Sequence, residues 1–282
     1  PSNTAVDLLT ERLVEKGLKV LRIGNPARIS ESLTRHSLEG QMSEHPEYKR
    51  IKKLKKSAIE YKDMARKYKR SFGRDEREQR KLLFAEAHRM KDEIAQIEEY
   101  VIKSLLAEAQ VITATLVGAA HRYVQKKHYS TVFIDEAAQA LEPATWIPII
   151  RSNRVVLAGD HCQLPPTVKS HEAAKQGLEL TLFEQAIRLL PQAATMLDTQ
   201  YRMNEKIMGF SNQEFYHGEL KAHESVAQHL LAESSDYLLG EPVDFIDTAG
   251  CGFEEDKNKE SSSTFNQGEA ELLIRHLEQL TE

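Results

Sequence analysis

Two adjacent acids that follow a short apolar run are the residues best placed to do chemistry in this chain. Val132, Phe133 and Ile134 lead directly into Asp135 and Glu136. We expect a buried parallel strand that delivers both carboxylates to its C-terminal edge, where open α/β sheets bind ligands. One such acid can hold Mg²⁺ while the other polarises the water that attacks a terminal phosphate, which is the Walker B arrangement. The alternative is that the acids only cap the following helix.

Two further clusters carry groups that suit phosphate chemistry. After the apolar residues 155–158, Gly159 permits a tight turn, and we expect Asp160 and Gln163 to lie near the two acids, where the Gln163 amide can bind a water or a phosphate oxygen. After residues 194–197, Arg202 offers a planar guanidinium suited to phosphate oxygens, and the neighbouring Tyr201 can stack on a base. The alternative for an isolated arginine is a surface ion pair.

Short apolar runs that alternate with helical segments must position these groups. The candidate strands are residues 19–23, 111–115, 132–135, 155–158, 194–197 and 243–247. Helices are expected between most of them, for example at residues 5–16, which Gly17 stops, and at residues 173–190. This alternation predicts an α/β fold with a parallel, wound sheet.

Residues 29–109 interrupt the alternation because they contain no strand signal. Apolar residues recur there every three or four positions, which predicts two helices in an antiparallel hairpin inserted into the α/β domain. The seam comprises Ile51, Leu54, Ala58, Tyr61, Ala65, Tyr68 and Phe72 in the first arm and Leu83, Ala87, Met90, Ile94, Ile97 and Val101 in the second.

The first arm of the hairpin is strongly basic. Residues 46–70 contain eleven Lys or Arg against three acids, although the net charge of the whole chain is −5. A basic rod on an acidic protein predicts contact with the phosphate backbone of a nucleic acid, whereas the alternative is a solvated helix face. The candidate contacts are Lys52, Lys53, Lys55 and Lys56.

Composition argues against several other kinds of protein. Cys162 and Cys251 form no CxxC spacing and the eleven histidines form no HExxH motif, so neither a disulfide scaffold nor a zinc site is expected. No apolar run approaches the length of a membrane span, so no membrane partner is expected. These features favour a cytoplasmic protein, or a nuclear one in a eukaryote.

Five motifs occur in order along the chain, all of them outside the hairpin. They are Pro1-Ser2-Asn3-Thr4-Ala5-Val6, Thr113-Ala114-Thr115, Asp135-Glu136-Ala137-Ala138-Gln139, Gly159-Asp160 with Gln163-Leu164-Pro165-Pro166, and Gln200-Tyr201-Arg202-Met203. Together they resemble the motifs of superfamily 1 helicases of 5′-to-3′ polarity, in the branch that contains the nonsense-transcript regulator and immunoglobulin mu-binding protein 2.

This resemblance implies a RecA-like parallel-sheet domain with an inserted helical hairpin, followed by part of a second RecA-like domain. The first domain would comprise residues 1–28 and 110–190, the hairpin residues 29–109, and the second domain residues 191–282. ATP would bind between the two domains, and closing and opening of that cleft would drive movement along a single strand.

The resemblance also implies roles for individual residues. Asp135 would bind Mg²⁺, Glu136 would activate the hydrolytic water, and Gln163 would sense the γ-phosphate of ATP. From the second domain, Arg202 would reach the γ-phosphate as an arginine finger and Tyr201 would stack on the adenine. The residues that would contact the backbone of the single strand are Ser2, Asn3 and Thr115.

One element of this family is missing from the sequence. No G-x-x-x-x-G-K-[ST] loop, which cradles phosphates, occurs in the 282 residues. In the family this loop precedes the segment matched by residues 1–6, and later motifs of the second domain, including a further arginine, would follow Glu282. We therefore expect the chain to be an internal piece of a longer helicase and, by itself, not to hydrolyse ATP.

The leading hypothesis is an ATP- and Mg²⁺-dependent helicase or translocase on single-stranded DNA or RNA, with its protein partners open. One alternative is another P-loop ATPase that remodels proteins, and a second is a non-catalytic nucleic-acid-binding scaffold built on a degenerate helicase core. The motif around Arg202 and the basic arm argue against the first alternative. The intact pair Asp135 and Glu136 argues against the second.

Overall fold

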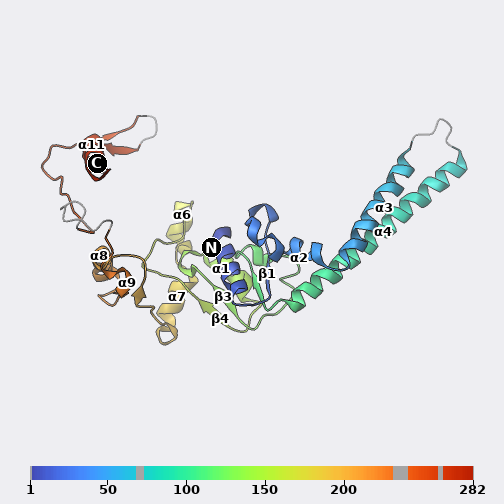
Figure 1. Ribbon diagram of the computed structural model, residues 1–282, viewed down its shortest axis with the longest axis horizontal. Coiled ribbons are helices and arrows are strands. Elements are labelled where there is room, and N and C mark those ends of the chain that lie inside the picture. Colours follow the sequence, from blue (N-terminus) through green and yellow to red (C-terminus); the bar gives the residue numbers. More distant parts are fainter. Residues whose placement is uncertain (1, 68–72, 231–240, 260–262, 282) are drawn as a thin grey trace. The chain divides into compact units, whose positions relative to one another are not determined.

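The computed structural model describes residues 2–67, 73–230, 241–259 and 263–281 (Figure 1). The chain divides into two compact units, Pro1–Pro191 and Gln192–Glu282. Both units combine helices with short strands, which places the protein in the predicted α/β class. None of the helices in the described ranges is long and apolar enough to cross a membrane.

Two pairs of parallel strands organise the first unit. β1 (Val20–Arg22) pairs with β2 (Val111–Thr113), and β3 (Val132–Ile134) pairs with β4 (Val155–Leu157). In the part of the chain that is described, each pair is a separate two-stranded sheet, so the predicted wound sheet is not continuous there. The short helices around these pairs are η1 (Pro26–Arg28), η2 (Glu31–His36), α2 (Leu38–Glu44), η3 (Gly118–Ala120), η4 (Ala137–Gln139) and α5 (Glu142–Ile149).

The β3–β4 pair is less buried than the sequence predicts. Ile134 is buried, but the side chain of Phe133 points the other way and 75% of this residue is exposed. Val155 and Val156 on β4 are exposed as well. The prediction of a buried strand therefore holds for Ile134 but not for Phe133, and the neighbouring strand is exposed at two consecutive residues.

Local signals set the bounds of α1 (Asn3–Glu15). The hydroxyl of Ser2 accepts a hydrogen bond from the backbone N–H of Ala5 at 3.2 Å and so caps the helix. Beyond the other end, Gly17 has a φ of 79°, in the left-handed region that favours glycine. The helix predicted for residues 5–16 therefore forms, and it begins two residues earlier.

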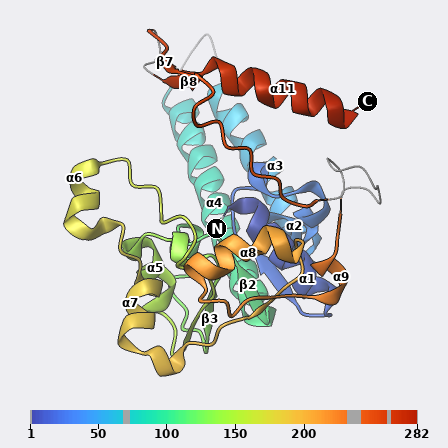
Figure 2. The same cartoon turned by 90° about the vertical axis from the view of Figure 1, so that its left-hand side faces the viewer.

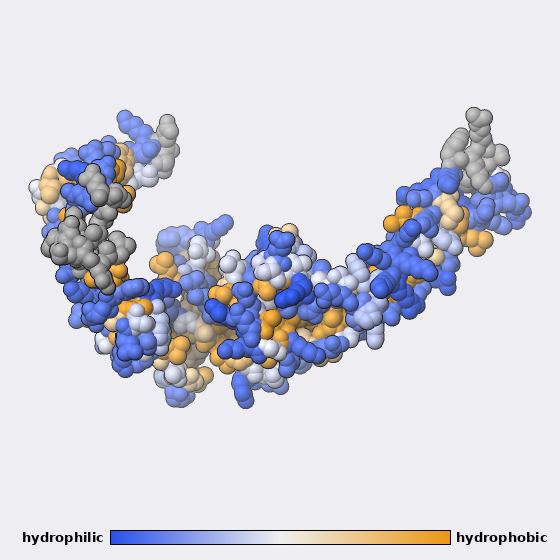
Figure 3. Space-filling view, in the orientation of Figure 1, coloured by the Kyte–Doolittle hydropathy of each residue, from blue (hydrophilic) through white to orange (hydrophobic). Residues whose placement is uncertain are grey.

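The hairpin consists of α3 (Tyr48–Arg66) and α4 (Arg74–Glu108), which lie side by side in Figures 1 and 2. Every predicted seam residue in the described ranges is buried or half-buried, whereas Tyr68 and Phe72 lie outside those ranges. At the start of α4 the Glu76 carboxylate accepts a hydrogen bond from the backbone N–H of Gly73 at 3.1 Å. The outer surface of both helices is mostly hydrophilic on the face shown in Figure 3.

The C-terminal half of α4 is part of the core of the first unit. Val101 is fully buried and Leu106 is 4% exposed. Both belong to one hydrophobic cluster with Leu21 of β1 and Ile51 of α3. The base of the hairpin and the first strand are therefore held by the same apolar contacts.

The helix predicted for residues 173–190 is interrupted. α6 (His171–Ala173) continues into the π-helical turn η5 (Ala174–Leu178), and α7 (Leu182–Leu189) starts afresh. Gly177, within η5, has a φ of 96°, which lies outside the right-handed helical region and kinks the chain there. The hydroxyl of Thr181 then caps α7 by accepting a hydrogen bond from the backbone N–H of Glu184 at 3.2 Å.

The second unit is built on two other strand pairs. The strands predicted at residues 194–197 and 243–247 are wrong, because neither run pairs with a neighbouring strand in the described ranges, and Leu197 and Phe245 are 88% and 86% exposed. Its elements are η6 (Pro191–Ala193) at the boundary, β5 (Thr199–Gln200) parallel to β6 (Lys221–Ala222), β7 (Glu255–Lys257) antiparallel to β8 (Thr264–Asn266), and the helices α8 (Glu205–Phe215), α9 (Glu224–Ala227) and α11 (Gln267–Thr281).

Candidate functional site

The two predicted acids lie at the C-terminal end of β3. Asp135 is half-buried and Glu136 is exposed. The backbone of Glu136 has a φ of 52° and a ψ of 41°, a left-handed conformation that turns the chain into η4. Its side chain makes no capping bond to η4, so the capping alternative does not hold for Glu136. Within the described ranges, neither carboxylate takes part in an ion pair.

The loops after β3 and β4 meet at this edge. The N–H of Ala158 donates a hydrogen bond to the carbonyl of Ile134, and the N–H of Ala137 donates one to the carbonyl of Ala158, both at 2.8 Å. Gly159 packs so closely that a Cβ placed there would lie 2.9 Å from the backbone nitrogen of Ala138. The structure therefore brings the loop with the two acids against the start of the Asp160 loop.

Asp160 organises the second of these loops. One of its carboxylate oxygens, Oδ2, accepts a hydrogen bond from the Gln163 side-chain amide at 2.8 Å, and the other, Oδ1, accepts one from the backbone N–H of Cys162 at 3.0 Å. The carboxylates of Asp135, Glu136 and Asp160 make this edge rich in oxygen donors. Such a donor set suits Mg²⁺ and its phosphate ligands, so the residues present fit a magnesium–nucleotide group.

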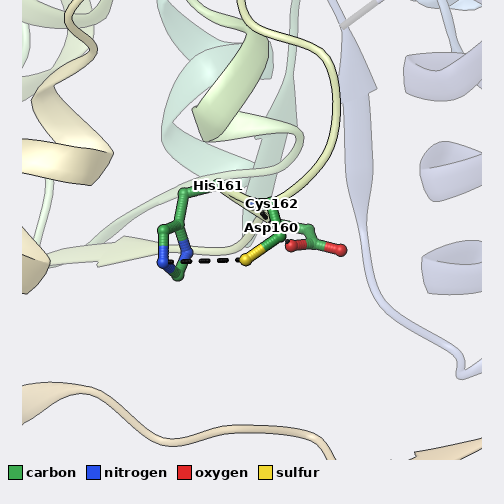
Figure 4. A group of neighbouring side chains, drawn as sticks. All are labelled: Asp160, His161 and Cys162. Atoms are coloured by element: carbon green, nitrogen blue, oxygen red, sulfur yellow. Dashed lines mark hydrogen bonds between the residues drawn. The ribbon is translucent and has the colours of Figure 1, made fainter. Parts of the chain in front are cut away.

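Three side chains that could together hold a metal ion, which the sequence motifs do not predict, lie in the same loop. Asp160, His161 and Cys162 each offer one ligand atom, and these atoms all lie within 4.8 Å of one another (Figure 4). No zinc site was expected from the sequence, and this arrangement does not by itself decide that expectation. The expectation rested on HExxH and CxxC spacings, whereas here three consecutive residues converge. Burial, assisted by the Asp160 charge, raises the pKa of the Cys162 thiol.

The residues predicted to contact a nucleic acid lie near the ends of β1 and β2. Ser2 and Asn3 begin α1, and Thr115 follows β2. Each side chain has a partner within the protein. Ser2 caps α1, the Asn3 carbonyl oxygen accepts a hydrogen bond from Arg22 at 3.1 Å, and the Thr115 hydroxyl accepts one from the N–H of Gly118 at 3.0 Å.

Arg22, the last residue of β1, was not among the predicted site residues. Its side chain connects the end of β1 to Asn3 and Asp7 of α1. Its side chain is completely buried. The guanidinium pairs with the Asp7 carboxylate at 2.9 Å and donates hydrogen bonds to Asn3 and to the carbonyl of Ile23. The signal that could have revealed it is a charged residue within the apolar run 19–23, since a buried charge requires a partner.

The four candidate lysines of the basic arm lie on α3, and all four are exposed. They differ in how far their charge is offset. The Lys55 ammonium lies 2.8 Å from Glu98 on α4, and that of Lys56 lies 4.0 Å from Glu60. Lys53, by contrast, has no ion-pair partner in the described part of the chain.

Further along the hairpin, like charges from both helices come together. Interaction with the Lys91 ammonium on α4 lowers the pKa of Lys62 on α3, and the charge of Arg66 contributes in the same direction. Repulsion between neighbouring cations is unfavourable unless an anion lies between them. The positive charge on the hairpin therefore extends from α3 to α4.

Arg202 and Tyr201 lie in the second unit, and both are exposed. The side-chain oxygen Oε1 of Gln200 shapes their turn by accepting hydrogen bonds from the backbone N–H groups of Arg202 at 2.7 Å and Met203 at 2.9 Å. The Tyr201 ring lies 4.4 Å from the His223 ring, with 30° between the two planes. The predicted approach of Arg202 to the two acids involves both units and stays a prediction.

Sequence comparisons identify relatives of both units. The sequence profile of a family described as an AAA domain matches residues 1–171, and a second profile with the same description matches residues 178–282. The chain is 35% identical over 291 residues to DNA-binding protein SMUBP-2 of Mesocricetus auratus. It is also 34% identical over 319 residues to an uncharacterized ATP-dependent helicase of Methanocaldococcus jannaschii. Over 227 residues it is 31% identical to the Regulator of nonsense transcripts 1 homolog of Drosophila melanogaster.

These relatives are much longer than the chain. The three matches cover 100%, 99% and 78% of this chain, but 29%, 47% and 17% of the respective relatives. The similarity therefore extends over both units, while each relative contains a large part that has no counterpart here.

Proposed function

We infer the function from one premise, which is that the chain belongs to the AAA-domain family of superfamily 1 helicases, in the branch of the nonsense-transcript regulators and immunoglobulin mu-binding protein 2. We propose that it is part of an ATP-driven translocase that moves 5′-to-3′ along single-stranded nucleic acid. The observation that carries the proposal is the β3–β4 edge, where two carboxylates that form no ion pair with any described residue meet the loop of Gln163.

Each residue at this edge has a role that its position supports. Mg²⁺–ATP, when bound, supplies the terminal phosphate that is transferred to water. Asp135, half-buried at the end of β3, would hold the cation, and the exposed Glu136 would orient and deprotonate the attacking water. The amide of Gln163, which Asp160 holds in place, would donate a hydrogen bond to a γ-phosphate oxygen.

The second unit would complete the nucleotide site. Arg202 would neutralise charge that develops on the γ-phosphate, and Tyr201 would stack on the adenine. Support comes from the exposure of both side chains and from the Gln200 hydrogen bonds that fix their turn. The nucleic-acid strand would contact Ser2, Asn3 and Thr115, together with the basic arm.

ATP turnover tests the assigned chemistry. The 282-residue chain has no phosphate-cradling loop, so it should release no phosphate above background with or without single-stranded nucleic acid. In a longer protein that contains this chain together with a G-x-x-x-x-G-K-[ST] loop, Glu136→Gln should slow turnover about 10²- to 10⁴-fold, because the general base is lost. Nucleotide binding, measured by filter assay, should persist. Near-normal turnover of that variant would show that Glu136 is not the general base for ATP hydrolysis.

Single-strand binding tests the basic arm. Replacing Lys52, Lys53, Lys55 and Lys56 with alanine should weaken binding of a labelled oligonucleotide to the chain and flatten its salt dependence, by a slope of about 0.7 for each phosphate that is no longer neutralised. Lys53→Ala should account for more of the weakening than Lys55→Ala, because Glu98 already offsets Lys55. Lys103→Ala, which removes a lysine paired with Glu99 on α4, is the matched control and should have no effect. Unchanged binding by the fourfold variant would show that the arm is only a solvated face.

A further inference from the structure

We propose that Asp160, His161 and Cys162 form a binding site for one Zn²⁺ ion. The site lies in the loop after β4, and the chemistry proposed above uses neither His161 nor Cys162. The inference rests on the convergence of three different ligand types, namely a carboxylate, an imidazole and a thiol, from consecutive residues (Figure 4).

The spacing of the donor atoms suits zinc. All three lie within 4.8 Å of one another, and the Cys162 sulfur lies 3.9 Å from Nε2 of His161. In a tetrahedral site, with Zn–S of about 2.3 Å and Zn–N of about 2.0–2.1 Å, these two atoms would lie about 3.6 Å apart. The sulfur–nitrogen pair is therefore close to tetrahedral spacing, and side-chain rotation would have to bring the Asp160 oxygen closer to both atoms.

The local structure already holds part of the site in place. Hydrogen bonds from the Cys162 N–H and the Gln163 amide fix the orientation of the Asp160 carboxylate, and a carboxylate can accept such bonds and bind a cation at the same time. Gly159 packs against η4 and anchors the start of the loop. His161 is exposed, so an ion can enter from solvent, and a water can take the fourth coordination position.

The ligand types select the metal. Thiolate and imidazole are ligands that zinc favours, whereas Mg²⁺ prefers oxygen donors alone. Formation of the Zn–S bond replaces the S–H bond of Cys162, and the proton leaves to solvent. The Asp160 carboxylate also accepts a hydrogen bond from the Gln163 amide. An ion bound to Asp160 would therefore be linked to Gln163, the residue proposed to sense the γ-phosphate. This link rests on the proposed function.

Cobalt substitution provides the first test. The untagged 282-residue chain, freed of metal with a chelator, is titrated with Co²⁺ and followed by absorption. We expect a thiolate-to-cobalt charge-transfer band and tetrahedral d–d bands that saturate at one ion per chain, and that Zn²⁺ abolishes. A chain that shows no thiolate band has no such site, and this result overturns the proposal without requiring any variant to fold.

Variants locate the site. By calorimetry with Zn²⁺, Cys162→Ala and His161→Ala should each weaken binding about tenfold or more, while the circular dichroism spectrum stays unchanged. Cys251→Ala, which removes the other cysteine, and His217→Ala are the matched controls and should bind as the parent does. Full binding by Cys162→Ala, or loss of binding in Cys251→Ala, contradicts the proposal. Because no readout uses ATP, failure here is distinguishable from failure of the proposed helicase function.

Discussion

At the end of β1 and β2 the polar side chains are bound to one another, whereas at the end of β3 and β4 the two acids have no cationic partner among the residues that the structure describes. Arg22 is completely buried and pairs with Asp7 at the first edge. Asp135 and Glu136 at the second edge are half-buried and exposed, and neither takes part in an ion pair within the described ranges. Both edges come from pairs of short parallel strands in the same unit.

The two edges use charged side chains differently, the first for stability and the second for binding. A buried ion pair that lacks one member leaves an uncompensated charge in the interior, so the first edge contributes to stability. Exposed carboxylates cost little in water and remain available for a cation, so the second edge contributes little to stability and is suited to binding. We therefore expect substitutions at the first edge to change unfolding and substitutions of the acids at the second edge to change activity.

The largest effect is expected for Arg22→Met. This change leaves the buried Asp7 carboxylate without its cationic partner. It should lower the free energy of unfolding by about 3–5 kcal/mol in a urea titration. Adding Asp7→Leu should recover part of the loss, since no unpaired charge then remains. Glu136→Gln is the comparison and should change stability by less than about 0.5 kcal/mol. Equal effects of Arg22→Met and Glu136→Gln would erase the distinction between the two edges.

An intermediate effect is expected for Gly159→Ala. The new Cβ would lie 2.9 Å from the backbone nitrogen of Ala138, so the loop that carries the acids must shift, at a cost of about 1–3 kcal/mol in the free energy of unfolding. The matched control is Gly209→Ala within α8, where no described atom lies within 4 Å of the added Cβ. That change should stabilise the chain by up to about 1 kcal/mol, because alanine favours the helix. If both variants unfold alike, the loops do not pack as described.

The smallest effect concerns the reactivity of Cys162. Burial and the Asp160 charge raise the pKa of its thiol, so less thiolate is present at a given pH. In chelator-treated protein, iodoacetamide should label Cys162 several-fold more slowly than the exposed Cys251, as measured by peptide mass spectrometry. The pH at which the Cys162 rate reaches half its maximum should lie above the ordinary value for a thiol. Faster labelling of Cys162 than of Cys251 would contradict this description of the second edge.

Local patterns were sufficient to predict much of the first unit. The four strands of this unit form where apolar runs end in polar residues, and the described seam residues of the hairpin are buried or half-buried at the predicted spacing. Sequence patterns failed where the formation of a strand depends on pairing with a neighbouring strand. Residues 194–197 are mostly apolar but have no strand beside them in the described ranges, whereas Lys221 lies in β6 because it pairs with β5. The break at Gly177 shows that a single left-handed residue overrides an otherwise helical run.

The candidate site was predictable in its residue types more than in its contacts. Motifs identified the acids and Gln163, but no sequence spacing indicates that Asp160 would hold the Gln163 amide. Arg22 was missed because its partner Asp7 lies fifteen positions away on another element, and periodicity does not report such pairs. The donor cluster around Cys162 was missed because consecutive residues match none of the usual metal spacings.

α4 is a single helix of 35 residues that begins in the outer hairpin and ends in the apolar cluster around Leu21. A continuous helix has no hinge between these regions, so we expect the hairpin not to unfold independently of the core of the first unit. Amides along the buried half of α4 should exchange their hydrogens together with those of β1, as one cooperative unit. A force applied to the hairpin would therefore be transmitted through α4 to the residues that pack against β1 in the core of the first unit.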